Sequence, residues 1–343
     1  MQVPEVLSRY REAVDAGLKS ALSEGDHPIF DMQRYHMGWL DKDFLPMSSN
    51  AGKAVRPTLC LFACEAVGGE WSHALPAAVS IELLHNFSLV HDDIQDGDTE
   101  RRHRQTVWYL WGYSHGLNTG TAMHIVANQA LPRLGATALS PELVLEVSRI
   151  LTQASMEMIE GQALDVRFER TPRVSSNDYL VMIEKKTGAL LEASLRIGAT
   201  IGTGDTTLVK EMSAFGHSIG RLFQVRDDIL GVWGKAEDTG KPAASDLHRR
   251  KKSLPVVHAL ENAGINASGK KFADIYRTKD ALSGTDIEAL LMIMDEFGTF
   301  SFCHGLAQRE AEKALQTLRQ SPLSPWAKQQ GGDLVEFLLE REY

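Results

Sequence analysis

Apolar residues recur along most of the chain with the spacing of an amphipathic α-helix. Between residues 5 and 23 they fall close to a 3.6-residue period, at Val6, Leu7, Tyr10, Val14, Leu18 and Leu22. The same period predicts helices over 57–68, 76–96, 141–168, 177–203, 207–233, 254–263, 286–297, 303–319 and 326–341. Strand signals are almost absent, so the pattern predicts an all-α protein.

Composition and charge narrow the class of protein. Of the 343 residues, 43% are hydrophobic and 24% are charged, which is ordinary for a globular protein. The length would allow two average domains, but single helical domains of this size also occur, and we expect one helical domain over residues 1–343. A core of this size needs no disulfide or metal to stabilise it. The formal net charge of −9 argues against nucleic acid as the main partner.

The cysteines and the N-terminal residues indicate a cytoplasmic protein. Cys60 and Cys64 stand at helical spacing among apolar residues and Cys303 is remote, so we expect buried free thiols, as in a reducing compartment. The first twenty residues carry charges throughout and lack the apolar segment of a signal peptide. No run approaches the roughly 18 apolar residues of a membrane span.

The most informative motif is an acidic cluster at the end of the helix predicted over 76–96. Asp92 and Asp96 are four residues apart, so their carboxylates share one face and repel unless a cation lies between them. Oxygen ligands without Cys or His neighbours favour Mg²⁺, which binds one or two carboxylates together with phosphate oxygens. Asp93 lies about 100° around the helix and is a weaker candidate. The structural alternative, a solvated acidic helix end, opposes the helix macrodipole.

A second acidic pair, Asp227 and Asp228, falls in another predicted helix. Two acidic motifs on facing helices could hold one diphosphate through two or three Mg²⁺ ions and stabilise it as a leaving group. Taken alone, the pair also fits a surface turn in which Arg226 forms a salt bridge.

Basic residues accompany both acidic clusters. They are Lys53 and Arg56, Arg101 and Arg102, Lys185 and Lys186, and Lys241, Lys251 and Lys252. Each is individually typical of a solvated surface charge. Together, in an acidic protein, they indicate an anionic ligand, and there are more of them than one metal-bound diphosphate needs. The pattern therefore favours two diphosphates.

The order of these motifs resembles that of the trans-isoprenyl diphosphate synthases, the polyprenyl synthetase family. The resemblance covers about residues 45–260. It is carried by GKAVRP at 52–57, ELLHNFSLVHDDIQD at 82–96, GQALD at 161–165, KT at 186–187, FQVRDD at 223–228, GK at 240–241, SDL at 245–247 and Lys251.

The resemblance implies a magnesium-dependent prenyltransferase, usually a homodimer, with an isoprenoid synthase-type bundle of about ten core helices around a central cavity. It also implies roles for residues. Metal ligands would come from Asp92, Asp93, Asp96, Asp227 and Asp228. The allylic diphosphate would contact Arg101, Lys186, Lys241 and Lys251. Isopentenyl diphosphate would contact Lys53, Arg56, His85 and Arg102. Thr187 and Gln224 would line the reaction centre.

Two features distinguish this chain within the resemblance. Gly231 stands where the second motif has a third aspartate, so one outer ligand is missing. Ser88 and Phe87, four and five residues before the first aspartate, would form the floor under the growing chain. One aromatic beside a small residue resembles geranylgeranyl diphosphate synthases and predicts a C20 product, with a farnesyl diphosphate synthase as the alternative.

Two other functions remain open. A class I terpene cyclase shares the fold but needs a metal triad of the form ND-x-x-S-x-x-x-E. Asn177 and Asp178 begin this pattern, whereas Val181 and Lys185 occupy its later positions. A catalytically inactive partner subunit of a heteromeric synthase is disfavoured, because the first acidic motif is complete.

Overall fold

The computed structural model describes residues 3–23, 25–47, 52, 54–137, 139–234, 243–264, 266–278 and 281–341. These residues are helical almost throughout. Paired strands within these ranges are confined to a short antiparallel hairpin of β1 (Glu100–Arg101) and β2 (Arg104–Gln105). The prediction of an all-α protein is confirmed.

The elements follow one another without long connections. The first half contains α1 (Val6–Arg9), α2 (Arg11–Ser23), α3 (Pro28–His36), α4 (Val55–Ala66), η1 (Trp71–Ala74), α5 (Leu75–Gln95), α6 (Val107–Trp111), α7 (Tyr113–Ala130), η2 (Leu131–Thr137) and α8 (Pro141–Arg170). The second half contains α9 (Ser176–Ile183), the π-helical turn η3 (Glu184–Gly188), α10 (Ala189–Gly202), α11 (Thr206–Trp233), α13 (Ser245–His248), α14 (Leu254–Glu261), η4 (Asn262–Gly264), α15 (Ala267–Arg277), α16 (Gly284–Glu296), α17 (Thr299–Gln320) and α18 (Pro325–Glu340).

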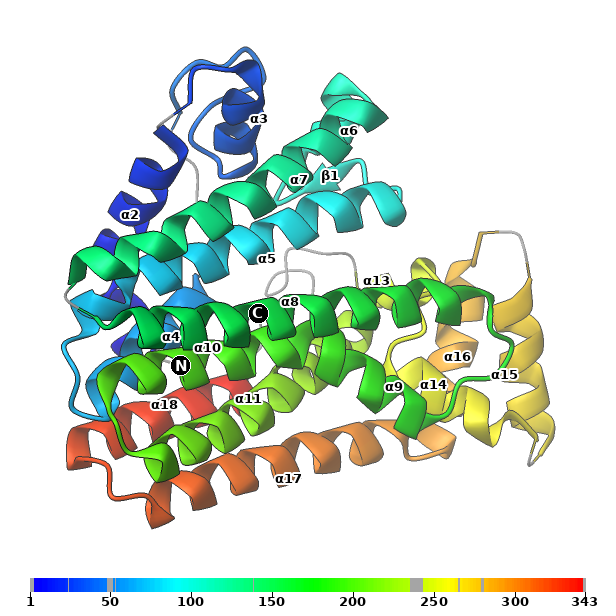
Figure 1. Cartoon of the computed structure of the whole chain (residues 1–343). Coiled ribbons are helices and arrows are strands. Elements are labelled where there is room, and N and C mark those ends of the chain that lie inside the picture. The colour runs from blue at the N-terminus through cyan, green and yellow to red at the C-terminus, as the bar shows by residue number, and fades with distance from the viewer. Residues whose placement is uncertain are drawn as a thin grey trace.

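Helix α10 lies at the centre of the bundle. It packs against α4, α8 and α11, while α17 covers the other side of α11 and α5 lies beside α7 (Figure 1). The main core includes the fully buried side chains of Leu61, Leu195 and Phe215, and a smaller core joins α13 to α16 around Leu247 and Phe272. Burial of this apolar surface is the main force that holds the helices together.

Helices α5 and α11, which carry the acidic motifs, both end on the side of the molecule where α13 lies (Figure 1). An ion pair between Asp98, just after α5, and Arg249, just after α13, joins the segments that follow the two motifs. The fold therefore brings together two acidic clusters that are far apart in sequence.

The helices predicted from apolar periodicity are confirmed, with interruptions that the periodicity did not reveal. The range 5–23 breaks at Tyr10 and the range 177–203 contains the π-helical turn η3. Helices α3, α6, α7, α13 and α15 were not predicted. Helix α7 buries many small side chains, among them Gly116, Thr119, Gly120 and Ala127, which let it approach α5 closely but give only a weak apolar period.

Two further observations in the described ranges concern the cysteines and the length and polarity of the helices. Cys60, Cys64 and Cys303 are buried and free, as predicted, and burial raises the pKa of the Cys60 thiol well above its ordinary value. Across the described ranges, every helix is too short or too polar to cross a bilayer.

Candidate active site

The first acidic cluster lies at the C-terminal end of α5. Pro76 stands in the first turn of this helix, and at its other end the backbone N–H of Asp96 still donates to the carbonyl of Asp92. The Asp92 side chain is 17% exposed, and Asp96 is exposed. Burial raises the pKa of both carboxyls, and the ammonium of Lys186 opposes the shift. Two neighbouring carboxylates at the electronegative end of a helix make this a site for a cation.

Asp93 points to a different partner. Its side chain is 2% exposed, and its Oδ1 accepts a hydrogen bond of 2.6 Å from Nε of Arg101. Burial raises the pKa of Asp93 to about 6, although Arg101 works in the opposite direction. Asp93 therefore orients Arg101 next to the cluster, and a metal would have to share the carboxylate with that guanidinium.

The π-helical turn η3 directs Lys186 towards the first cluster. Gly161 in α8 allows the turn to approach, because a Cβ at this position would lie 2.6 Å from Cα of Lys186. Nζ of Lys186 lies 2.6 Å from Oδ2 of Asp165 and 3.7 Å from Oδ2 of Asp92. Burial would lower the pKa of Lys186, but Asp92 and Asp165 outweigh it and raise the pKa. The π-turn thus places a protonated lysine beside the acidic face of α5, and π-turns are often found at functional sites.

Asp228, in α11, is satisfied by the protein itself. Its side chain is 1% exposed and accepts hydrogen bonds from Tyr179 Oη at 2.6 Å, Gln224 Nε2 at 3.0 Å and the backbone N–H of Leu254 at 3.2 Å. Burial raises its pKa to about 6. Gln224 in turn accepts a hydrogen bond of 2.8 Å from Oγ1 of Thr187. Asp228 therefore ties α9 and α14 to α11 and fixes the Gln224 amide beside Thr187.

Asp227 is open to solvent but already has a cationic neighbour. Its side chain is 51% exposed, and its Oδ1 lies 3.1 Å from Nη2 of Arg341, the residue after α18. Arg341 is 6% exposed, and its guanidinium lies 4.3 Å from the centre of the Phe223 ring. The carbonyl of Arg341 accepts hydrogen bonds from Nε and Nη2 of Arg226. The end of α18 thus places a guanidinium where Asp227 would bind a cation.

Lys251 lies near the second acidic cluster, within reach of the charges of Asp228 and Asp227. Its side chain is accessible to water although protein encloses the space around it, and this enclosure would lower its pKa. The carboxylates of Asp246 and Asp228 outweigh that effect and raise the pKa, and Asp165 and Asp227 act in the same direction. Asp165 also pairs with Lys186, so this one carboxylate links Lys186 beside the first cluster with Lys251 beside the second.

A group of basic side chains, the basic cluster of Arg56, Arg102 and His85, adjoins the second acidic cluster through Arg56. Burial lowers the pKa of Arg56 to about 10 and that of Arg102 below its ordinary range, with Glu82 opposing both shifts. Burial also lowers the pKa of His85 far enough to keep the ring neutral. Nε of Arg56 is buried and, among the described residues, has no hydrogen-bond partner. Two guanidinium groups facing one buried carboxylate leave excess positive charge, so an anion fits here.

Arg102 is held against the backbone at Gly52. A Cβ at residue 52 would lie 2.6 Å from Nη2 of Arg102, and Nη1 of Arg11 donates a hydrogen bond of 2.6 Å to the carbonyl of Gly52. Arg56 also interacts electrostatically with Asp227. The basic cluster is therefore close enough to the second acidic cluster for the two to influence each other.

Phe87 and Ser88 take different directions around α5. The Phe87 ring is 8% exposed and packs against His91 and against His124 of α7, with ring centres 5.1 Å apart in both cases. Oγ of Ser88, which is partly exposed, donates to the carbonyl of His85. Phe87 therefore supports the packing of α5 against α7, while Ser88 lies nearer to the face of Asp92.

Some candidates cannot be placed, and some participants were not anticipated. Lys53 and Lys241 lie outside the described residues. The contributions of Arg341, Tyr179 and Arg11 were missed, because each reaches the site from an element without a motif. Their only signal was weak, namely a basic residue at or next to a helix end for Arg11 and Arg341 and an aromatic residue within a predicted helix for Tyr179.

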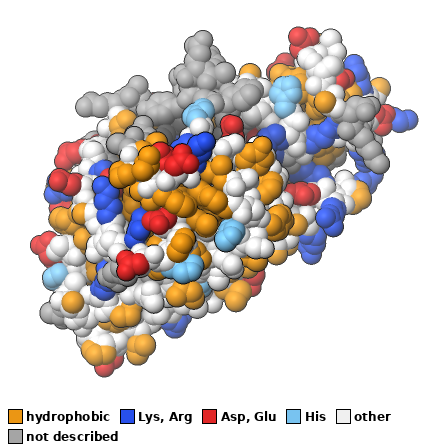
Figure 2. Space-filling model, turned by 90° about the horizontal axis from the view of Figure 1, so that it is seen from above, with side chains coloured by type: hydrophobic (Ala, Val, Ile, Leu, Met, Phe, Trp, Pro, Cys, Tyr) orange, Lys and Arg blue, Asp and Glu red, His pale blue; other side chains and the backbone are white. Residues whose placement is uncertain are grey.

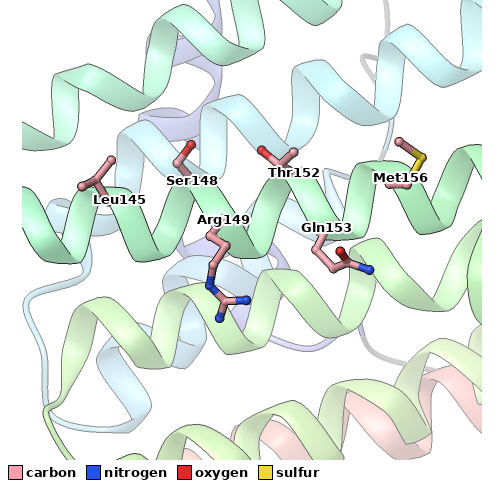
Figure 3. A pocket seen from close by; sticks show the side chains of 6 residues that line it. All are labelled: Leu145, Ser148, Arg149, Thr152, Gln153 and Met156. Carbon is pink, nitrogen blue, oxygen red and sulfur yellow. The ribbon is translucent and has the colours of Figure 1, made fainter.

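A shallow groove on the surface is separate from this chemistry. It runs along the outer side of the first half of α8 and is lined by Leu145, Ser148, Arg149, Thr152, Gln153 and Met156 (Figure 3). None of these six side chains is a carboxylate, and they precede the Asp165 turn of the same helix. The groove is not the site that the acidic motifs define.

Comparisons with known proteins give consistent matches over most of the chain. The family described as polyprenyl synthetase matches residues 38–294. The chain is 36% identical to a (2E,6E)-farnesyl diphosphate synthase of Mycobacterium tuberculosis, covering 98% of this chain and 93% of that protein. It is 34% identical to a geranylgeranyl diphosphate synthase of the same organism, covering 93% and 90%. A crystal structure of a polyprenyl synthetase from Streptomyces coelicolor superposes with a TM-score of 0.90 at 35% identity, covering 97% and 98%.

Proposed function

Since the chain belongs to the polyprenyl synthetase family and is a prenyltransferase of the short-chain trans type, we propose that it makes geranylgeranyl diphosphate. It would condense isopentenyl diphosphate with allylic diphosphates until the chain reaches C20, within one domain over residues 1–343. The observation that carries the proposal is that Asp165 links Lys186, beside Asp92, with Lys251, beside the second acidic cluster, while a separate group of basic side chains lies alongside.

The donor set fits Mg²⁺. The candidate ligands are carboxylates alone, which suits a hard divalent cation of the kind this family uses. In the part of the chain that the structure describes, no three His, Cys, Asp or Glu side chains are grouped closely enough to hold a metal by themselves. Mg²⁺ accepts such an open site, because diphosphate oxygens and water complete its coordination. We infer two or three ions, held by Asp92 and Asp96 on one side and by Asp227 on the other, with Asp93 and Asp228 as supporting carboxylates.

The allylic diphosphate would lie between the two clusters. Lys186 and Lys251, with Arg101 beside them, would neutralise its charge. Lys241, which lies outside the described residues, would act in the same way. When bound, Mg²⁺ supplies further positive charge to the departing diphosphate. Positive charge placed in advance where negative charge develops lowers the barrier to breaking the allylic C–O bond.

Isopentenyl diphosphate would bind at the basic cluster. Arg56, Arg102 and the neutral ring of His85 would hold its diphosphate, together with Lys53. Fixing this anion next to the allylic group turns an encounter between two molecules into a reaction within one complex. The carbon–carbon double bond then attacks the allylic cation, a new carbon–carbon bond forms, and the resulting cation loses a proton to the released diphosphate. Thr187 and Gln224 would line this centre, with Gln224 oriented by Asp228.

The C20 product rests on Phe87 and Ser88. A single aromatic residue beside a small one leaves more room under the growing chain than two aromatic residues would. The Phe87→Ala variant is expected to lengthen the product, and Phe168→Ala, which removes a buried aromatic ring from α8, serves as the control. Unchanged product length in Phe87→Ala would contradict this assignment.

A product assay tests the proposal as a whole. The purified protein is incubated with Mg²⁺, isopentenyl diphosphate and one of three primers, which are C5, C10 and C15 allylic diphosphates. We expect all three to converge on C20. A product that stops at C15 would favour the alternative of a farnesyl diphosphate synthase, and absence of elongation with every primer would contradict a prenyltransferase.

A terpene cyclase is disfavoured by the residues at the triad positions. Val181 is 40% exposed and offers no ligand atom, and Nζ of Lys185 lies 2.5 Å from Oε2 of Glu160. Incubation with a prenyl diphosphate alone is expected to give no cyclic hydrocarbon by gas chromatography.

We also propose a homodimer that uses the outer sides of α7 and α8. Exposed large apolar side chains are concentrated on these helices, namely Tyr113, Leu117, Ile125, Leu145, Met156 and Ile159. Figure 2 shows apolar side chains gathered on one face and bordered by charged ones. Large exposed apolar surfaces are typical of protein interfaces. Analytical ultracentrifugation should give a dimer that Ile125→Lys shifts towards monomer.

A further inference from the structure

The π-helical turn η3 needs support from outside its own backbone. The backbone N–H of Ala189 donates to the carbonyl of Glu184, which is five residues earlier, whereas an α-helix would bond residues four apart. Ordinary α-helical bonding would turn the side chains of η3, including that of Lys186, to other directions around the axis. Because π-helical turns are rare, contacts with neighbouring helices have to favour this one.

Helix α11 supplies such contacts at both ends of η3. Nη1 of Arg221 lies 3.0 Å from Oε1 of Glu184, the residue whose carbonyl closes the π-helical bond. Gly220 lets the backbones meet at the other end, because a Cβ there would lie 2.7 Å from Cα of Gly188. The first and last residues of η3 are therefore held against the same turn of α11.

A buried carboxylate orients Arg221 from behind. Glu310 of α17 is 2% exposed, and its Oε1 lies 3.5 Å from Nε of Arg221 and 3.0 Å from Nζ of Lys313. Its Oε2 is buried and, within the described part of the chain, accepts no hydrogen bond. A buried carboxylate is costly unless a cation accompanies it. Arg221 therefore offsets the charge of Glu310, and Glu310 fixes the guanidinium in the direction of Glu184.

Lys186 depends on this arrangement for its direction, because its Nζ reaches the acidic face of α5 from within η3. An ion pair on the α8 side of η3 joins Lys185 to Glu160, and these side chains are 35% and 51% exposed. Ion pairs as exposed as this one contribute little to stability. The Arg221 side chain is only 18% exposed, so its contact with η3 is the stronger tether.

We propose that Arg221 is a positioning residue of the active site, which holds Glu184 and thereby the π-helical turn that directs Lys186 at the first acidic cluster. Arg221 itself touches neither substrate, and Glu310 serves to orient it. The inference rests on the proposed function, because it takes Lys186 to contact the allylic diphosphate. It assigns a function to a buried ion pair that no motif marks.

Calorimetry on two variants tests the tether. Arg221→Met removes the guanidinium, and Glu184→Ala removes its partner in η3 while leaving the pair of Arg221 and Glu310 intact. Both variants should weaken the binding of an unreactive allylic thiolodiphosphate with Mg²⁺ by about tenfold, the scale of losing one hydrogen bond to a charged group. Binding of isopentenyl diphosphate should stay within about twofold, because its proposed contacts lie on α4, α5 and the hairpin of β1 and β2. Equal weakening of both ligands, or no weakening of either, would overturn the proposal.

A double variant shows whether Arg221 acts through Lys186. Arg221→Met/Lys186→Ala should bind the thiolodiphosphate within about twofold of Lys186→Ala alone, because a tether has no effect once the lysine that it directs is gone. If the two losses multiply instead, Arg221 acts by another route and the proposal is wrong.

The control variant is Arg9→Met, which removes a paired guanidinium far from the site along α4. Nε and Nη2 of Arg9 donate hydrogen bonds of 3.0 Å and 2.7 Å to Glu65, near the end of α4 opposite to Arg56. It should leave both affinities unchanged, and thermal unfolding of every variant separates loss of binding from loss of fold. Failure of the unmodified protein to bind the thiolodiphosphate with Mg²⁺ would count against the proposed function, whereas unchanged binding in Arg221→Met and Glu184→Ala would count against this inference alone.

Discussion

The two acidic motifs have the same opening pair of aspartates, yet the structure uses them differently. On α5 the leading residue Asp92 faces Lys186 at 3.7 Å and keeps its carboxylate free of hydrogen bonds from the surrounding described residues. On α11 the leading residue Asp227 already has the guanidinium of Arg341 at 3.1 Å. The first motif is prepared for a cation, while the second holds a side-chain cation in its place.

The second aspartates also differ in their partners. Asp93 receives one hydrogen bond from Arg101, a residue of the site itself. Asp228 receives three, and two of them come from α9 and α14. The comparison teaches that a repeated acidic pattern can combine a ligand with a structural anchor, and that only the partners of each carboxylate reveal which is which.

The largest effect is expected for Asp92→Asn. It removes a carboxylate that we assign to the metal, so kcat should fall by about 10²–10³-fold, the usual scale for losing one group that stabilises transition-state charge. Because burial raises the pKa of Asp92, the charged form is costly and the unfolding free energy should be unchanged or higher. Steady-state kinetics measures kcat, and urea unfolding measures the unfolding free energy. Activity within twofold of the unmodified protein would remove the first motif from the mechanism.

The Asp228→Asn variant should show most clearly how the roles of the two motifs differ. An amide nitrogen would face donors from Tyr179 and Leu254, so the variant should lose about 2 kcal/mol of unfolding free energy in urea, typical of a broken buried hydrogen bond to a charged group. Asp228→Asn should weaken Mg²⁺ binding less than Asp92→Asn does. If stability were retained while Mg²⁺ binding disappeared, Asp228 would be a ligand and the comparison would be wrong.

Asp93 should make stability depend on pH. Its pKa is about 6 in the folded protein against 3.8 for the free side chain, so the stability it contributes is present below about pH 4 and is lost as the pH rises through 6. Asn at this position does not titrate. The difference in unfolding free energy between the unmodified protein and Asp93→Asn should therefore fall by up to about 3 kcal/mol from pH 4 to pH 7. Parallel pH profiles would contradict this shift.

The smallest effect concerns Arg341. Arg341→Gln should free Asp227 and lower the Mg²⁺ concentration for half-maximal rate by up to about fivefold, the equivalent of a half-exposed ion pair. Arg319→Gln, an exposed residue near the end of α17, is the control. A higher Mg²⁺ requirement in Arg341→Gln would mean that Arg341 helps to bind the substrate and does not compete with the metal.

The sequence predicted the bundle and the motif residues because both depend on local pattern. Apolar periodicity gave helices such as α5 and α11, and the spacing of Asp92 and Asp96 gave a shared face. The π-turn at Lys186 was not predictable, since it depends on the close approach of Gly161 from α8. Helix α7 was missed because the side chains it buries are small.

The remaining contacts that the sequence did not predict join residues that are far apart along the chain. Arg341 reaches Asp227 across more than a hundred residues, and Asp246 fills the space at Gly231 from another element. At the sequence level Gly231 predicted a missing ligand. The structure places the Asp246 side chain against this glycine, a contact that no spacing rule could have indicated.

The central claim is that carboxylates of α5 and α11 hold one diphosphate through shared divalent cations, beside a cluster of basic side chains that holds the second. The most direct measurement is a crystal structure with Mn²⁺, an unreactive allylic thiolodiphosphate and isopentenyl diphosphate, with Mn²⁺ located by anomalous scattering. The account predicts Mn²⁺ at Asp92 and Asp96 and at Asp227, all bound to one diphosphate, with the other diphosphate at Arg56 and Arg102. Mn²⁺ at one motif only, or both diphosphates away from these residues, would contradict it.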